Sequence, residues 1–163
     1  MVEEYPEDIE TLQALVFLQS SCGQPDEAIK TAKASLRLQP EQPTLNLFAG
    51  RYYRQTGHLD QAISHFIDAL RQEPDKLDLY VELAETHRQR REDRLALDVY
   101  LKAVEALPED HQAYCLTAEL MKEAKDYPGA EKMLRSAAKV APDDVKIRRQ
   151  LSAVMALNLV HSP

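Results

Sequence analysis

Apolar side chains recur along this chain at the spacing of packed helix faces. Near the start, an i, i+3, i+6, i+7 stripe is formed by Ile9, Leu12, Leu15 and Val16. Near the end, an i, i+4, i+7, i+8 stripe is formed by Ile147, Leu151, Val154 and Met155. A stripe of this kind predicts an amphipathic helix with one buried face. Both ends of the chain are therefore predicted to be helical, and Asp144 is placed to cap the last helix.

Small residues and prolines between these ends repeat every 34 residues. The alanine series is Ala28, Ala62, Ala96 and Ala130, and the proline series is Pro40, Pro74, Pro108 and Pro142. A third series of small residues is Ser35, Ala69, Ala103 and Ala137. Small side chains let two antiparallel helices approach closely, and larger ones would overpack the contact. Proline cannot continue a helix, so each proline in the series predicts the end of one repeat.

One complete repeat lies between Pro43 and Pro74. In order, its marker residues are Ala49, Gly50, Tyr53, Ala62, Phe66, Ala69 and Pro74. This order and the 34-residue period resemble the tetratricopeptide repeat (TPR), a helix–turn–helix unit with the pattern W-x2-L-G-x2-Y…A-x3-F…P. Asn46 stands in place of the Trp, and Ala49 in place of the Leu. The first repeat differs most, with Gln19 in place of the Tyr and Ala32 in place of the Phe.

The resemblance implies an all-α protein, a right-handed α–α superhelix of four helix–turn–helix repeats with a ninth, C-terminal helix. The repeats would cover residues 9–42, 43–76, 77–110 and 111–144, and the extra helix residues 145–160. All of them would belong to a single array over residues 1–163. The turn inside a repeat falls at Gly23, Gly57 and Arg91, and in the last repeat it is marked by Asp126, Pro128 and Gly129.

Four arginines crowd the turn of the third repeat: Arg88, Arg90, Arg91 and Arg94. We interpret them as a solvated turn, because Glu92 and Asp93 balance part of their charge. An anion site is the alternative.

Charge and composition narrow the classes of partner. The net charge of −7, with a pI near 5.2, argues against nucleic-acid binding, which favours a basic face. Much of the imbalance comes from the acidic start of the chain, so the repeats themselves are nearly neutral. No apolar run reaches the roughly 20 residues of a membrane helix, and the start does not resemble a secretory signal. Cys22 and Cys115 fall in distant repeats, which disfavours a disulfide and predicts a cytoplasmic location.

No catalytic constellation stands out, so we predict no enzymatic activity, no cofactor and no metal. The histidines come without an HExxH or CxxC motif, and zinc sites need three or four converging ligands. With only four glycines in the chain, no GxGxxG or phosphate-binding loop can be written. Most tyrosines fall in TPR packing positions, which favours a core role over base stacking.

In TPR arrays the first helix of each repeat lines a concave groove, so the resemblance implies a binding surface there. The inner positions are Phe17, Leu47, Phe48, Arg51, Arg54, Val81, Glu82, Glu85, Arg88, Leu116, Glu119 and Lys122. Cys115 occupies a further inner position. Apolar members would anchor a peptide or helix, and charged members would orient it. The alternative is that an added helix, or the curvature of the array, covers these positions.

The carboxylate clamp of chaperone-binding TPR proteins is not expected. In one frame its positions hold Gln13, Phe17, Phe48, Asp78 and Glu82. In the next frame they hold Leu47, Arg51, Glu82, Gln112 and Leu116. Most of these positions hold apolar or acidic side chains where the clamp needs Lys, Arg and Asn.

The leading hypothesis is a non-enzymatic protein–protein interaction scaffold that binds a peptide or helix in its groove. A second hypothesis is homo-oligomeric assembly, a two-fold dimer above all, through the last helix. Its second apolar line is Ala153, Leu157 and Val160. A third is that the array is the regulatory segment of a larger protein. Neither nucleic acid nor membrane is an expected partner.

Overall fold

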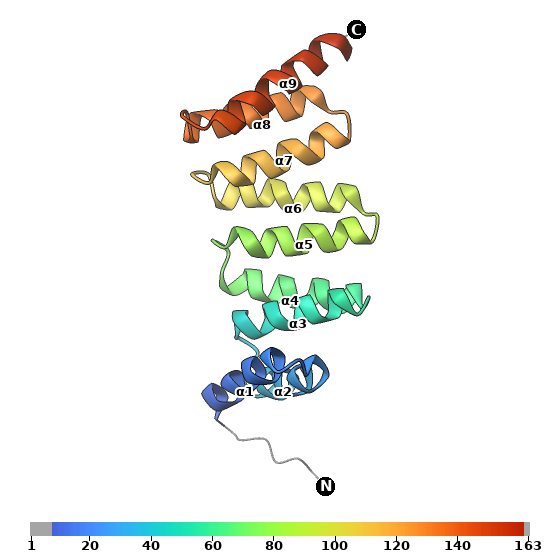
Figure 1. The fold of residues 1–163 in the computed structure, drawn as a ribbon, viewed down its shortest axis with the longest axis vertical. Helices are drawn as coiled ribbons and strands as arrows, with labels where there is room; N and C mark the ends of the chain where they lie inside the picture. The colour runs from blue at the N-terminus through green and yellow to red at the C-terminus, as the bar shows by residue number, and fades with distance from the viewer. Residues whose placement is uncertain (1–7, 162–163) are drawn as a thin grey trace. The chain divides into compact units, whose positions relative to one another are not determined.

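The computed structural model describes residues 8–161, and the secondary structure in that range is entirely helical (Figure 1). The helices are α1 (Ile9–Ser21), α2 (Pro25–Leu38), α3 (Pro43–Gln55), α4 (Leu59–Gln72), α5 (Leu77–Gln89), α6 (Asp93–Ala106), α7 (His111–Glu123), α8 (Tyr127–Val140) and α9 (Val145–His161). Consecutive pairs reproduce the four predicted repeats, and α9 follows them. The all-α, helix–turn–helix fold predicted from the sequence is therefore confirmed.

Two compact units divide the chain, one ending at Thr86 and the other beginning at His87. In the first unit α1 packs on α2, α2 on α3, and α3 on α4. In the second unit α6 packs on α7, α7 on α8, and α8 on α9. The boundary falls inside α5, so each unit contains helices from more than one repeat. The single array over residues 1–163 stays a prediction.

A residue with positive φ closes the turn inside each repeat. These residues are Gly23 (φ 74°), Gly57 (φ 81°), Arg91 (φ 61°) and Lys125 (φ 63°). Glycine adopts this conformation without steric cost. For Arg91 and Lys125 the same conformation costs roughly 1–2 kcal/mol each. The sequence located the first three correctly. In the last repeat Lys125 makes the turn, while Asp126 caps α8 by accepting a 3.0 Å hydrogen bond from the amide of Gly129.

The two series of small residues are completely buried in every repeat. All eight members have no exposed surface, as predicted: Ala28, Ala62, Ala96, Ala130, Ser35, Ala69, Ala103 and Ala137. Because each has a side chain of one or two heavy atoms, it leaves room for the close packing of α1 on α2, α3 on α4, and α7 on α8. This close approach is why the 34-residue period is visible in the sequence.

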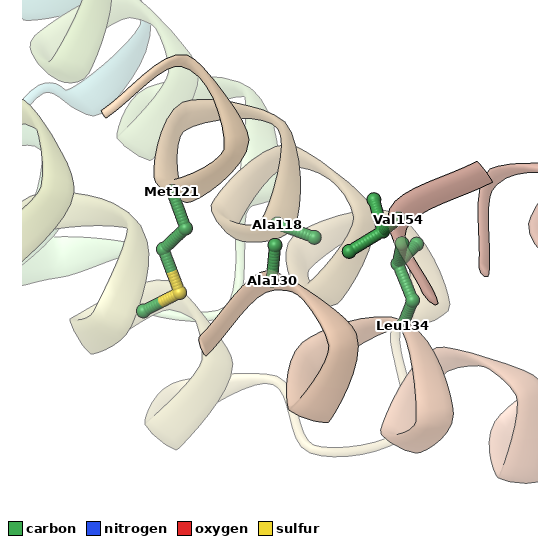
Figure 2. Packing of buried hydrophobic residues seen from close by; sticks show 5 residues of the cluster. All are labelled: Ala118, Met121, Ala130, Leu134 and Val154. Carbon is green, nitrogen blue, oxygen red and sulfur yellow. The ribbon is translucent and has the colours of Figure 1, made fainter. Parts of the chain in front are cut away.

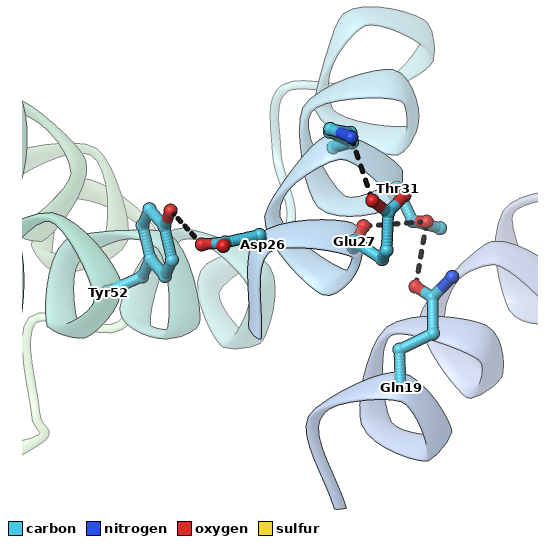
Figure 3. Close-up of polar contacts among 6 residues, drawn as sticks. Gln19, Asp26, Glu27, Thr31 and Tyr52 are labelled. Carbon is cyan, nitrogen blue, oxygen red and sulfur yellow. Dashed lines mark hydrogen bonds and ion pairs between the residues drawn. The ribbon is translucent and has the colours of Figure 1, made fainter. Parts of the chain in front are cut away.

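The divergent first repeat replaces motif residues with a polar contact (Figure 3). Thr31 of α2, which is fully buried, donates a 2.8 Å hydrogen bond to the side-chain carbonyl of Gln19 in α1. A second contact joins this repeat to the next, where the hydroxyl of Tyr52 in α3 donates to Asp26 in α2 at 2.7 Å. This hydrogen bond raises the pKa of the Tyr52 phenol. The missing Tyr and Phe are thus offset by hydrogen bonds on both sides of α2.

The last repeat and α9 share one buried cluster, formed by Ala118, Met121, Ala130, Leu134 and Val154 (Figure 2). From α9, Ile147 and Val154 are almost completely buried, as the predicted stripe requires. Met155 does not follow that prediction, because 39% of its surface is exposed. The side-chain amide of Asn158 instead secures the end of the helix, donating to Glu131 of α8 at 2.7 Å.

Candidate functional site

In the first unit, three of the predicted groove charges bind one another. The carboxylate of Glu82 in α5 meets Nε of Arg51 and Nη2 of Arg54, both in α3, at 2.6 Å each. Only the first contact is an aligned hydrogen bond; the second is a charge contact without that alignment. The Glu82 side chain is 13% exposed. This cluster therefore joins α3 to α5 and leaves one net positive charge on the surface.

Apolar groove candidates in the same unit differ in exposure. Leu47 and Phe48 of α3 and Val81 of α5 are half-buried, as is Glu85, whereas Phe17 of α1 is 49% exposed. Each half-buried side chain has part of its surface packed against the protein and part exposed to solvent.

In the second unit, α7, α8 and α9 enclose a cavity of about 90 Å³. Its lining residues are Cys115, Ala118, Glu119, Lys122, Leu134, Gln150, Ala153 and Val154. Three of these form an apolar wall from three helices, Ala118, Leu134 and Val154, as Figure 2 shows. Glu119 and Lys122, both predicted groove residues, place opposite charges at this cavity. Leu116, the remaining candidate from α7, is half-buried.

Ala153, which was predicted at an oligomer interface, is exposed and also lines this cavity. Its place in an oligomer interface stays a prediction. Counting back in steps of 34 residues, Ala153 corresponds to Glu119, Glu85 and Arg51, all predicted inner positions. Gln150, which was not among the predicted groove residues, also occupies an inner position of the register and lines the cavity. Continuing the repeat register beyond Pro142 would have found both residues.

The thiol of Cys115 is neutral in this setting. Burial raises its pKa, and the nearby carboxylates of Asp144, Asp110 and Glu119 raise it further. A protonated thiol is a poor nucleophile, so Cys115 contributes a small apolar surface to the cavity.

Charges at the turn of the third repeat are also paired. Arg88 contacts Glu123 at 2.8 Å, and Arg90 contacts Glu92 at 3.2 Å. These contacts agree with the interpretation of a solvated, balanced turn.

The rest of the predicted oligomer interface lies at the end of α9. Leu157 is half-buried, whereas Val160 is 77% exposed and its neighbour Leu159 is 79% exposed. The exposed apolar surface of this helix therefore centres on its last turn.

Comparison with known proteins identifies the family. A tetratricopeptide repeat family model matches residues 21–66 and 47–111, which together exceed half of the chain. The chain belongs to the tetratricopeptide repeat family. Proteins of this family are generally non-enzymatic scaffolds for protein–protein interaction, and the fold supports that general role here. A search of curated proteins found no match.

Solved structures with the same fold are distant in sequence. The MamA protein is 15% identical, with a TM-score of 0.72 over 93% of this chain and 83% of that one. YrrB, described as a TPR protein with an unusual peptide-binding site, is 20% identical, with a TM-score of 0.69 over 99% of this chain and 83% of that one. A tetratricopeptide repeat protein from Parabacteroides merdae is 20% identical, with a TM-score of 0.74 over 93% of this chain and 60% of that one.

Within residues 8–161, no helix combines the length and the apolar character needed to cross a membrane.

Proposed function

We propose that this protein is a non-enzymatic scaffold that binds a polypeptide segment on the inner face of α7 and α9. The observation that carries the proposal is the cavity between these helices, where Glu119, Lys122, Gln150 and Ala153 converge on an apolar wall. All four occupy inner-helix positions of the repeat register. YrrB, which has the same fold, is described as having a peptide-binding site.

The cavity suits one small apolar side chain of a bound segment. Its volume of about 90 Å³ and its apolar wall of Ala118, Leu134 and Val154 suit an apolar side chain of the segment. Glu119 and Lys122 carry opposite charges and would orient the polar backbone of the segment. Apolar anchoring surrounded by charge is the usual arrangement of an interaction hot spot.

The first unit supports a contact of the same kind but not a carboxylate clamp. Leu47 and Phe48 offer half-buried apolar surface beside the ion pairs of Glu82. A clamp needs cationic and amide side chains that converge on a free carboxylate. Here Glu82 already occupies Arg51 and Arg54, so a terminal carboxylate of a ligand would have to compete with it.

Selection of peptides from a random displayed library against the intact chain tests the proposal. Ala153→Arg would fill the cavity, and selected peptides should lose about tenfold or more in affinity. Ser152→Arg is the matched control, because Ser152 is the exposed neighbour in the same helix and does not line the cavity. Circular dichroism verifies that both variants keep the fold. Peptides that bind Ala153→Arg as tightly as the wild type would exclude this surface as the binding site.

A second candidate function is self-assembly through the last turn of α9. Leu159 and Val160 favour it, because both expose more than three quarters of their surface. Identical patches on two copies can meet about a two-fold axis. This candidate does not compete with the first, since neither residue lines the cavity.

A further inference from the structure

The fourth position of the first helix makes the same hydrogen bond in the third and fourth repeats. In α5, the hydroxyl of Tyr80 donates to the carbonyl of Pro74 at 3.0 Å. In α7, the hydroxyl of Tyr114 donates to the carbonyl of Pro108 at 3.2 Å. Each proline ends the preceding repeat. A tyrosine ring therefore lies at each of these two junctions, and its hydroxyl is hydrogen-bonded to the proline carbonyl.

The second repeat makes this hydrogen bond without a ring. Asn46 occupies the same position of α3, and its side-chain amide donates to the carbonyl of Pro40 at 3.0 Å. Asn46 also lines a cavity of about 450 Å³, with Leu36, Pro40 and His65 among the other lining residues. Where the other two repeats carry a phenol ring, this repeat therefore has an amide and an open cavity.

His65 of α4 is oriented so that one ring nitrogen is an acceptor. Its Nδ1 lies 2.9 Å from Oδ1 of Asn46. Because the Asn46 amide nitrogen donates to Pro40, Oδ1 is the acceptor and Nδ1 of His65 carries the proton. Nε2 then has a lone pair, and no hydrogen bond to it is present within residues 8–161. The ring is stacked on Tyr53, with centroids 5.5 Å apart and planes 8° apart, which fixes its orientation.

Charges at the mouth of the cavity favour a cation. Asp68 and Arg71 of α4 form an ion pair at 2.7 Å and neutralise each other. Glu41, in the connection between α2 and α3, also lines the cavity and is exposed, and in the described part of the chain it has no ion pair. Glu41 is therefore the lining carboxylate that has no ion pair in the described part of the chain, while the positive charge of Lys33 acts on His65.

We propose that this cavity binds a tyrosine side chain of a protein partner, next to a basic residue of that partner. The phenol ring occupies the space beside Asn46, its hydroxyl donates to Nε2 of His65, and the basic group lies near Glu41. Ligand cavities of a few hundred Å³ with a small number of placed polar groups are typical of specific recognition. The site lies on α2, α3 and α4 and shares no lining residue with the cavity of α7, α8 and α9, so its test is independent of the function proposed above.

Three small probes that share one ring test this assignment by amide chemical shifts of the intact chain. Tyramine carries the phenol and a positive charge, phenethylamine lacks the hydroxyl, and 4-hydroxyphenylacetate replaces the cation by an anion. We expect tyramine to shift the amides of Asn46 and His65 and to bind about fivefold or more tightly than either analogue, the difference that one hydrogen bond or one charge contact provides. Equal binding of tyramine and phenethylamine, or no shift at these amides, would refute the proposal.

Two variants and one control locate the probe. Asn46→Tyr places a ring in the cavity from within and should abolish tyramine binding, whereas Ser64→Tyr, on the exposed face of α4, should leave it unchanged. His65→Phe keeps a ring on Tyr53 but removes the acceptor, so tyramine should bind no better than phenethylamine. His65→Phe decides the matter if Asn46→Tyr does not fold. Undiminished tyramine binding by a folded Asn46→Tyr, or by His65→Phe, would overturn the assignment.

Discussion

Gly50 of α3 lies directly against the ring of Phe66 in α4. A Cβ atom at Gly50 would come within 2.8 Å of Cζ of Phe66, closer than two carbon atoms approach without repulsion. Phe66 itself is completely buried and cannot turn away into solvent. The closest approach of these two helices therefore depends on the absence of a side chain at this position.

Gly50→Ala should destabilise the protein even though alanine is the better helix former. The gain in helix propensity is about 1 kcal/mol, whereas overpacking against a buried ring costs typically 1–3 kcal/mol. We expect a net loss of up to about 2 kcal/mol in the free energy of unfolding, measured by urea denaturation. In a Phe66→Leu background, Gly50→Ala should lower the free energy of unfolding by less than it does in the presence of Phe66. A stabilised single variant would show that Phe66 can move aside.

Glu82 should contribute more to stability than either arginine that it binds. Glu82→Gln removes the charge that holds both Arg51 and Arg54, and we expect a loss of about 1–2 kcal/mol in the free energy of unfolding. Arg51→Gln should cost less than about 1 kcal/mol, because Arg51 is half exposed and Arg54 still holds the carboxylate. The comparison uses denaturation at low and high salt. Equal losses in the two variants would show that the cluster does not act through Glu82.

His65 should make stability fall as the solution is acidified. Burial lowers its pKa below the ordinary value of 6.5; Asp68 opposes this effect and Lys33 adds to it. At pH values below 6.5, the unfolded chain binds the proton more readily than the folded chain does. The free energy of unfolding therefore decreases as the pH falls toward the folded-state pKa of His65, and it is regained as the pH rises. Melting temperatures between about pH 7.5 and about pH 5 should therefore vary less in His65→Phe than in the wild type. An unchanged pH dependence would contradict the prediction.

Most of the fold was readable from the sequence because its packing rules repeat. The alanines at the helix crossings tolerate almost no other side chain, so the 34-residue period survives in the residues themselves. The turn residue of the last repeat was less visible, because Lys125 adopts positive φ without being glycine. Met155 was misplaced because the buried residues of α9 are only Ile147 and Val154 within the described part of the chain, so its buried stripe is narrower than the predicted one.

Side-chain pairing in the candidate site could not be predicted from the repeat register. The register assigns Arg51 and Glu82 to inner positions, but both side chains are long, and their contact depends on the spacing of α3 and α5. The cavity at Ala153 was predictable, and required only that the register continue into α9. The cavity at Asn46 needed the structure, because a missing ring becomes a cavity only if its neighbours do not close over it.

Phe48 and Phe66 should differ sharply in their contribution to stability. Phe66→Ala should cost about 3–5 kcal/mol, as expected for a fully buried ring. Phe48 is half-buried at the surface of α3, so Phe48→Ala should cost about 1–2 kcal/mol. Urea denaturation of the two variants under the same conditions makes the comparison. A loss at Phe48 as large as that at Phe66 would place Phe48 in the core and exclude it from a binding surface.

The end of α9 should determine whether the chain associates with itself. Leu159 and Val160 leave large apolar surfaces in water, and burial of each side chain would contribute roughly 1.5–3 kcal/mol. If two copies meet at this patch, Val160→Glu brings two like charges together near the two-fold axis and should give monomers in light scattering. Ser152→Glu adds the same charge elsewhere on the helix and should leave the dimer intact. A wild-type chain that is monomeric at high micromolar concentration, or a dimer that survives Val160→Glu, would exclude assembly through this patch.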